Sequence, residues 1–422
     1  MIAKAPPSGG AFLYTDSMTP TKKATIIIFA TVLIDMIGMT IILPALPIYV
    51  EKFSTSTFTI GMVYSIFAAA AFIAGPILGS LSDRYGRRPI LIASIFGTSL
   101  GWVIFALAGN IWVVFLSRII DGLTAGNVSV AQSYLTDIAK DDKDRTLKLG
   151  LIPMCIGIGF IMGPGIGGLL TKISPVLPFW TTAGLALLNA IAAYFFLPES
   201  LKKSAQKEQK SPIQLNPFKS IIYGLTHKKY RTLILLLLAT SMSFESYHAM
   251  FIPYLHKQFG FDVSAAGLLL SGIGVMIAFN QLVLMKHFWL HRFKPFIIQL
   301  MTATALILIF ALAGLVPFII FLGLLAILGL LEGTLSVING SELAAAAEHH
   351  ERGKIIGISH SLIAISQVAA PAISGFFMDS YIGSLWLFSA FWMMIVFVIL
   401  LTHKTELRNR HLEPELEKTA QQ

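Results

Sequence analysis

Five ionisable side chains lie inside long apolar stretches of this sequence. They are two aspartates, two glutamates and one arginine: Asp35, Arg118, Asp121, Glu245 and Glu332. A charge at the centre of a bilayer costs about 2.5–3.5 kcal/mol on insertion scales, so such residues are candidates for binding protons, ions or substrates. The sequence offers no nucleophile–base pair or metal triad beside them, which argues against an intramembrane enzyme. The set predicts a site for proton transfer or for a charged small molecule.

Asp35 is the strongest candidate for the proton-carrying group. It lies about 11 residues into the apolar run 24–50, hence about 16 Å deep at the rise of an α-helix. Arg118 and Asp121 share one face of the run 111–139 at the spacing i,i+3 and reach an overlapping depth. We expect Arg118 to lie between the two aspartates and to keep both ionised until a conformational change separates them. A structural ion pair is the alternative role.

Two further acids lie in the second half of the chain. Glu245 and Glu332 fall near the middle of the runs 230–259 and 317–347, and either could bind a cationic substrate or carry a proton. His248 is expected more as a packed or pore-lining histidine than as a proton relay. The excess of acids over arginine would favour cationic or zwitterionic guests over anions.

Twelve apolar runs position these side chains. Each is about 20 residues or longer, the length at which a helix crosses a hydrocarbon core of about 30 Å. The chain of 422 residues is 13% charged, against roughly 25% in soluble domains. The sequence therefore predicts an all-α membrane protein, not a β-barrel of alternating ten-residue segments. The twelve transmembrane helices are expected near residues 24–50, 57–82, 89–109, 111–139, 146–171, 176–197, 230–259, 264–286, 294–315, 317–347, 353–378 and 381–402.

Basic residues gather on one side of this topology. With both termini inside, all but four of the 31 Lys and Arg lie on the inner side; the exceptions are Lys52, Lys172, Lys257 and the intramembrane Arg118. This positive-inside bias explains the net charge of +9 without nucleic acid. It predicts a multi-pass protein of the cytoplasmic (inner) membrane with both termini in the cytoplasm. The first 23 residues are polar and are expected to be a tail, not a signal peptide.

The two halves of the chain are related by sequence. An offset of 206 or 207 residues superimposes several prolines and glycines, among them Pro47 on Pro253, Gly61 on Gly267 and Pro164 on Pro371. An even number of helices in each copy gives parallel repeats about an axis along the membrane normal. The expected order is a tail (1–23), a six-helix bundle (24–197), a charged linker (198–229), a second six-helix bundle (230–402) and a tail (403–422).

A short charged loop joins the second and third runs. Residues 79–88 read Gly-Ser-Leu-Ser-Asp-Arg-Tyr-Gly-Arg-Arg, which resembles the Gly-x-Leu-x-Asp-Arg-x-Gly-Arg-Arg signature of the major facilitator superfamily. The glycines allow a tight turn and close backbone approach. In family members the matching aspartate pairs with basic groups and a helix end when the transporter is open outward, and the arginines contact neighbouring helices or lipid headgroups. The resemblance implies a gating loop made of Gly79, Asp83, Arg84, Gly86, Arg87 and Arg88; for the last two arginines, setting topology alone is the alternative role.

Two other elements resemble the drug/proton antiporter branch of that superfamily. The run 146–171 contains a Gly-x-x-x-Gly-Pro-x-x-Gly-Gly pattern, and the Arg-x-x-Gln-Gly element is matched at 118–122 with Asp121 in place of glutamine. Glycines four apart let helices approach closely, proline kinks a helix, and generic packing is the alternative reading. The glycine pattern comprises Gly159, Gly163, Pro164, Gly167 and Gly168.

The resemblance implies a secondary transporter, not an enzyme: a proton-coupled antiporter that exports small amphiphilic molecules by alternating access. Its implied partners are a small-molecule substrate, protons as the coupling ion and membrane lipids, with no other cofactor, no metal and no nucleic acid, and the protein is expected to be a monomer. The alternatives are an importer or facilitator of a small metabolite on the same fold, a dedicated siderophore or metabolite exporter, and a signalling scaffold with a transporter-like body.

Overall fold

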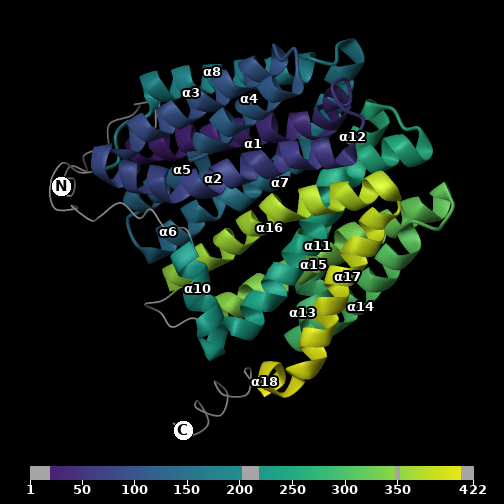
Figure 1. Ribbon diagram of the computed structural model, residues 1–422. Coiled ribbons are helices and arrows are strands. Elements are labelled where there is room, and N and C mark those ends of the chain that lie inside the picture. Colours follow the sequence, from purple (N-terminus) through teal and green to yellow (C-terminus); the bar gives the residue numbers. More distant parts are fainter. Residues whose placement is uncertain (1–19, 202–217, 347–351, 410–422) are drawn as a thin grey trace, which may run out of the picture.

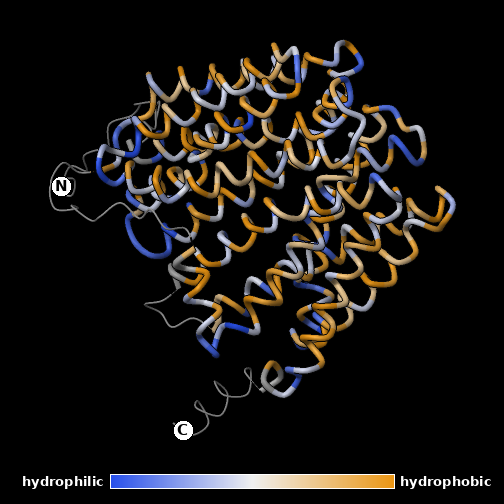
Figure 2. The backbone as a smooth tube through the Cα atoms, in the orientation of Figure 1, coloured by the Kyte–Doolittle hydropathy of each residue, from blue (hydrophilic) through white to orange (hydrophobic). Residues whose placement is uncertain are grey.

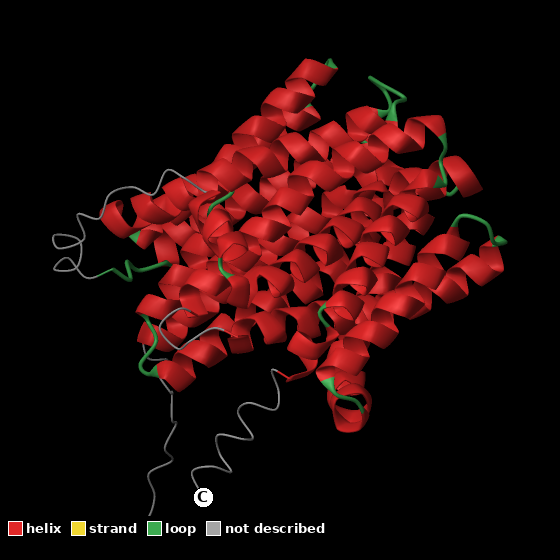
Figure 3. Cartoon of the chain, turned by 60° about the horizontal axis from the view of Figure 1, so that its bottom comes forward, coloured by secondary structure: helices red, strands yellow, loops and turns green. Residues whose placement is uncertain are grey.

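The computed structural model describes residues 20–201, 218–346 and 352–409, and these ranges consist of helices joined by short loops (Figure 1, Figure 3). Residues 1–19 and 410–422 of the expected tails and residues 202–217 of the expected linker lie outside them. The hydropathy colouring places apolar residues along the helices and hydrophilic residues mainly at their ends (Figure 2). This is the distribution that a polytopic membrane protein requires.

Within the described residues, twelve helical spans are long and apolar enough to cross a membrane. Those of the first half are α1 (Pro20–Val50), α2 (Thr57–Tyr85), α3 (Arg87–Ala106), α4 (Ile111–Leu123) continued by α5 (Asn127–Asp137), α6 (Asp142–Leu149) continued by α7 (Leu151–Ile173), and α8 (Leu177–Phe196). Those of the second half are α11 (Lys228–Phe259), α12 (Val263–Phe279) continued by the π-helix η1 (Asn280–Trp289) and α13 (Leu290–Arg292), α14 (Pro295–Ala313), α15 (Phe318–Ala346), α16 (Arg352–Ser380) and α17 (Ser384–Thr402). The short helix α10 (Phe218–Thr226) precedes α11, and the short helix α18 (Lys404–Asn409) follows α17.

The twelve predicted membrane helices are confirmed, with ends that move by a few residues; α1 begins at Pro20 and not at residue 24. Both halves start at the same face and cross six times. We call the face that holds the 85–87 turn, residues 138–141 and the start of α11 the basic face. The opposite face holds the loops 51–56, 107–110, 174–176, 260–262, 314–317 and 381–383.

The turn between α2 and α3 is a single residue. Gly86 has φ 108°, a conformation that L side chains rarely adopt, and its N–H donates to the carbonyl of Ser82. The tight turn expected from the sequence therefore requires glycine there. Gly79 differs: it lies within α2, and a Cβ on it would have no neighbour within 4 Å. The close backbone approach expected at Gly79 is wrong, because the residue faces open space.

The two halves meet along two helix pairs, α2 with α16 and α7 with α12, and Figure 1 shows the first half above the second. At the opposite face Asp379, near the end of α16, accepts from Ser56 Oγ (2.5 Å), Thr57 N (2.6 Å) and Phe58 N (3.2 Å). A carboxylate at a helix N-terminus satisfies its unpaired N–H groups and complements its dipole. Lys257 Nζ also donates across the halves to the carbonyl of Thr55 at 2.8 Å. The opposite face is therefore closed by polar contacts.

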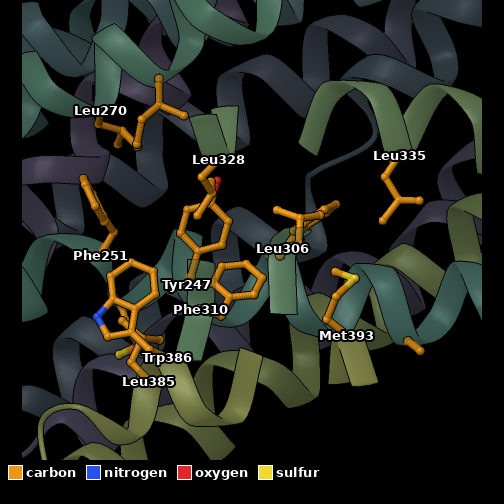
Figure 4. Packing of buried hydrophobic residues seen from close by; sticks show 14 of the residues in the cluster. Tyr247, Phe251, Leu270, Leu306, Phe310, Leu328, Leu335, Leu385, Trp386 and Met393 are labelled. Carbon is orange, nitrogen blue, oxygen red and sulfur yellow. The ribbon is translucent and has the colours of Figure 1, made fainter. Parts of the chain in front are cut away.

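Aromatic side chains fill the core of the second half. Tyr247, Phe310 and Trp386 are buried, with ring centroids 5.9 to 6.2 Å apart (Figure 4). Such rings bury large apolar areas and restrict one another's orientation. The packing holds Tyr247 on α11 in a defined position beside α15.

The glycines of α7 lie in close helix contacts on two sides. A Cβ on Gly163 would lie 1.9 Å from Thr40 Oγ1 and one on Gly167 would lie 1.8 Å from the carbonyl oxygen of Ile41, both on α1. On the other side, a Cβ on Gly168 would lie 2.8 Å from the Cα of Ser264 on α12. These distances are far below van der Waals contact, so α7 can lie between α1 and α12 only where it lacks side chains.

We predict that Gly167→Ala lowers the free energy of unfolding by about 1–3 kcal/mol, the usual cost of overpacking. The added methyl would collide with backbone that cannot rotate away. The measurement is the melting temperature of the purified protein in detergent. Gly157→Ala is the matched control on the same helix, since a Cβ there has nothing within 4 Å. Equal melting temperatures for the two variants would contradict the packing argument.

Candidate functional site

A cavity of about 550 Å³ lies between the two halves. Helices α1 to α5, α7 and α8 line it from the first half, and α11, α12 and α16 from the second. Most of its wall is apolar. Four of the five predicted intramembrane charges line it, namely Asp35, Arg118, Asp121 and Glu245; the fifth, Glu332, is buried beside the lining residue His248.

Arg118 and Asp121 form a buried ion pair. Arg118 Nη1 lies 3.0 Å from Asp121 Oδ2, and the two side chains are 3% and 5% exposed. The guanidinium carbon lies 3.5 Å from the ring centroid of Trp102 and 4.8 Å from that of Phe105. The aromatic faces attract the cation and help to offset its desolvation. The pair contributes no net charge to the cavity when both groups are ionised.

The expected place of Arg118 between two acids is wrong. Asp35 accepts a hydrogen bond from Asn127 Nδ2 at 2.8 Å, and among the described residues no ion pair joins Asp35 to Arg118. The cause is a helix break: α4 ends at Leu123 and α5 begins at Asn127. The break presents the Asn127 amide to Asp35, while Asp121 and Trp102 hold the guanidinium.

A second polar cluster lies on the side of the second half. Glu332 on α15 accepts from the buried Tyr247 hydroxyl with Oε2, and its Oε1 lies 3.1 Å from His248 Nε2. Glu245 Oε1 accepts from Gln367 Nε2 at 3.2 Å. His248 and Glu245 are half-buried and line the cavity, whereas Glu332 is only 6% exposed.

The structure therefore sorts the charges into two kinds. Two pairs join groups that can carry opposite charges: Arg118 with Asp121, and His248 with Glu332. Asp35 and Glu245 instead accept from neutral amides. Charge that is not neutralised locally is thus concentrated on these two carboxylates, one from each half.

Sequence reasoning missed two amide side chains that line the cavity. Asn127 and Gln367 are absent from the predicted site residues, whereas His248, expected as a packed or pore-lining histidine, does line the cavity. A signal was present in the sequence, because amide side chains inside apolar runs need a hydrogen-bond partner just as charges do. Which partner each amide takes depends on contacts between helices that are far apart in sequence.

The signature loop binds parts of the first half together. Asp83 pairs with Arg87, and Arg87 Nε lies 3.0 Å from Asp137 Oδ2 at the end of α5. Glu199 accepts from the N–H groups of Arg87 (2.9 Å) and Arg88 (3.2 Å) at the start of α3. Arg88 donates to the carbonyl of Tyr194 on α8, and Arg84 lies over the Tyr85 ring. Arg87 and Arg88 thus contact neighbouring helices, as expected, whereas Arg84 lies over a ring of its own helix.

Comparison with known proteins agrees with this architecture. The family model described as Major Facilitator Superfamily matches residues 28–339 and 234–421. A tetracycline resistance protein, class C, of Escherichia coli is 30% identical over 62% of this chain and 66% of its own length. Multidrug resistance protein 2 of Bacillus subtilis (strain 168) is 25% identical over 90% of this chain and 94% of its own length.

A solved structure has the same fold. It is the crystal structure of a bacterial homologue of the human lysosomal transporter Spinster in an inward-facing, occupied conformation, with a TM-score of 0.71 and 15% identity. It covers 94% of this chain and 98% of that chain. At this identity the likeness concerns the fold alone.

We predict that Asp121→Ala lowers the free energy of unfolding by about 3–5 kcal/mol, since it leaves a buried guanidinium unpaired. Lys172→Ala is the control. It removes an ion pair with Asp262 whose atoms are 3.6 Å apart and whose side chains are 58% and 57% exposed, so it should cost no more than about 1 kcal/mol. Thermal unfolding in detergent compares the two variants. Similar losses would mean that Arg118 does not depend on Asp121.

Proposed function

Because this chain belongs to the major facilitator superfamily, it is a transporter of small molecules and not an enzyme, and we propose that it is a proton-coupled antiporter that exports small amphiphilic compounds. The two bundles, at about residues 24–197 and 230–402, would rock about the central cavity and expose it alternately to the two faces. Protons would be the coupling ion, and the proposal requires no other cofactor and no resident metal.

The observation that carries this proposal is the environment of Asp35. Its carboxylate lines the cavity and accepts from a neutral amide, Asn127, at 2.8 Å. A carboxylate held by an amide can gain or lose a proton without breaking an ion pair. Asp121, in contrast, is tied to Arg118. Asp35 is therefore our proton carrier, while Arg118 and Asp121 shape the cavity beside it.

The cavity also supports the proposed class of substrate. Its walls are mostly apolar, which suits an amphiphilic guest of limited size. Asp35 and Glu245 add two carboxylates that neutral amides hold. At an effective dielectric of about 20, a carboxylate favours a nearby cation over an anion by several kcal/mol. Cationic compounds should therefore bind better than anions of equal size.

Export is the direction that the relatives favour, because one of them is a tetracycline resistance protein and another is a multidrug resistance protein. An importer or facilitator of a metabolite, or a dedicated siderophore exporter, is the alternative on the same fold. Transport in vesicles of known orientation separates these alternatives. Uptake toward the basic face under a physiological proton gradient would support import.

The orientation follows from the basic residues. We propose that the basic face is cytoplasmic, because Lys and Arg of short loops are retained on that side of a membrane. This places the protein in the cytoplasmic membrane with both termini inside. On this assignment Asp379 and the α2 N-terminus close the outer side. We propose a monomer surrounded by lipid as the working unit.

We predict that Asp35→Asn lowers uphill accumulation of ethidium several-fold while the protein still inserts and binds the dye. The substitution keeps the shape and the bond to Asn127 but cannot carry a proton. The measurement is ethidium accumulation in proteoliposomes driven by a pH gradient, where the variant should reach a lower accumulation ratio than the wild type. Asp142→Asn, an exposed acid of α6, is the control and should accumulate dye as the wild type does. A variant that concentrates ethidium as strongly as the wild type would eliminate Asp35 as a coupling residue.

Gating is the role that we propose for the loop 79–88. Asp83 pairs with Arg87, which also holds Asp137, so movement of α2 relative to α3 and α5 must alter these pairs. We predict that Asp83→Asn slows turnover several-fold and leaves ethidium affinity at equilibrium nearly unchanged, because the loop lies at the basic face. Initial rates in proteoliposomes and dye binding in detergent test this, again beside Asp142→Asn. Weakened binding with a normal rate would contradict a gating role.

A further inference from the structure

His248 lies at the cavity wall beside the carboxylate of Glu332. Its Nε2 lies 3.1 Å from Glu332 Oε1, and Glu245, three residues earlier on α11, shares its face of the helix. The side chain lines the cavity from α11, and the ring of Phe160 on α7 faces it with centroids 6.3 Å apart. Among the described residues, His248 is the only histidine that lines the cavity.

Glu332 is built to orient this imidazole. Both of its carboxylate oxygens have partners, Oε1 at His248 and Oε2 at the Tyr247 hydroxyl. Tyr247 is fully buried and is packed against Phe310 and Trp386 (Figure 4). Because Tyr247 cannot swing away, Glu332 is held in place, and Nε2 of His248 must donate to it. The second ring nitrogen, Nδ1, has no hydrogen-bond partner among the described residues and is the atom available for proton exchange.

Other charged or titratable groups reach this region from several helices. Glu245 and Tyr247 lie on α11, and Glu332 lies on α15. The residue that α16 contributes, Gln367, is neutral. Across the cavity α1 contributes Asp35, α2 contributes Tyr64, and α4 contributes the Arg118–Asp121 pair. Since that pair is neutral overall, the acids Glu332, Glu245 and Asp35 dominate the field at His248. They favour an imidazolium, and an arriving cation opposes it.

We infer that His248 is a second proton-carrying residue, and that a cation binding at Glu245 displaces its proton. This inference rests on the proposed antiport and adds a second proton to each cycle. When the cavity opens to the opposite face, Nδ1 takes a proton from that side and the imidazolium stays hydrogen-bonded to Glu332. When the cavity opens to the basic face, substrate binds beside Glu245 and the proton leaves from Nδ1 to that side. Imidazole is suited to this exchange because it changes charge between about pH 5 and 8.

The inference predicts a change in charge movement that a structural role would not produce. With protons on Asp35 and His248, export of one monovalent cation exchanges for about two protons, so one net charge crosses in each cycle. His248→Gln should exchange about one proton for one cation and become electroneutral. Its transport should still respond to a pH gradient.

The test uses the full chain in proteoliposomes with ethidium, a monovalent cation, as the probe. A potassium gradient with valinomycin imposes a membrane potential at equal pH, and a separate series imposes a pH gradient without a potential. We expect the wild type to be driven by either gradient and His248→Gln by the pH gradient alone. His287→Gln, an exposed histidine of the same half, is the matched control and should behave as the wild type.

Each outcome has one meaning. If His248→Gln keeps the wild-type response to potential, the inference is wrong while the antiport stands. If the wild type responds to neither gradient, the proposed antiport fails and this inference fails with it. If the wild type is driven by the pH gradient but not by the potential, it moves no net charge. That result would also overturn the inference that a second proton is carried.

A second measurement leaves His248 in place, so its result does not depend on whether the His248→Gln variant folds. Purified Asp35→Asn in weakly buffered detergent solution should still release about one proton for each ethidium bound at pH 6–7, and this proton comes from His248. Ethidium that binds without proton release would overturn the inference.

Discussion

The cost of placing charge among apolar helices is the constraint on which the rest of this structure depends. Removing an ion from water costs several kcal/mol even after relaxation, so each intramembrane charge needs a partner. The chain meets this requirement in three ways: with an opposite charge for Arg118, with a neutral amide for Asp35 and Glu245, and with a histidine and a tyrosine for Glu332. The type of partner determines what each residue can do.

These differences separate structural charges from exchangeable ones. The Arg118–Asp121 pair lies against Trp102 and is almost fully buried, so either group loses its partner if the other changes its charge. Asp35 and Glu245 have partners that tolerate both protonation states, because an amide can donate to a carboxylate or accept from a carboxylic acid. Alternating access needs groups of the second kind where substrate and protons meet, and groups of the first kind to hold the walls.

The two halves are joined by close helix packing between α7 and α12, and by polar contacts between Asp379 and the start of α2. The glycines of α7 allow it to contact α1 within the first half and to contact α12 across the interface, as at Gly168 and Ser264. At the opposite face, Asp379 holds the N-terminus of α2 through several short polar contacts. Packing of small residues permits sliding and rocking, whereas polar contacts must break before the halves can separate. Rocking would therefore be resisted most where Asp379 meets α2.

Much of this architecture is determined by local sequence. The length of each apolar run is enough to predict a membrane helix, and the repeat with its offset of about 206 residues predicts two halves of like orientation. Gly86 makes the α2–α3 turn because few other residues adopt its φ of 108°. The charges inside the runs also identified four side chains that line the cavity, Asp35, Arg118, Asp121 and Glu245, since burying them without a function is costly.

Only the tertiary structure decided the partner of each charge. Arg118 and Asp121 are three residues apart, and their pairing could be predicted from helical spacing. Asp35 and Asn127 are 92 residues apart, and Glu332 and Tyr247 are 85 apart. Their meeting depends on the break after α4 and on how α11 packs against α15. Local sequence determines which residues must find partners; the packing of distant helices, which depends on side-chain shape across the whole bundle, determines the partners they find.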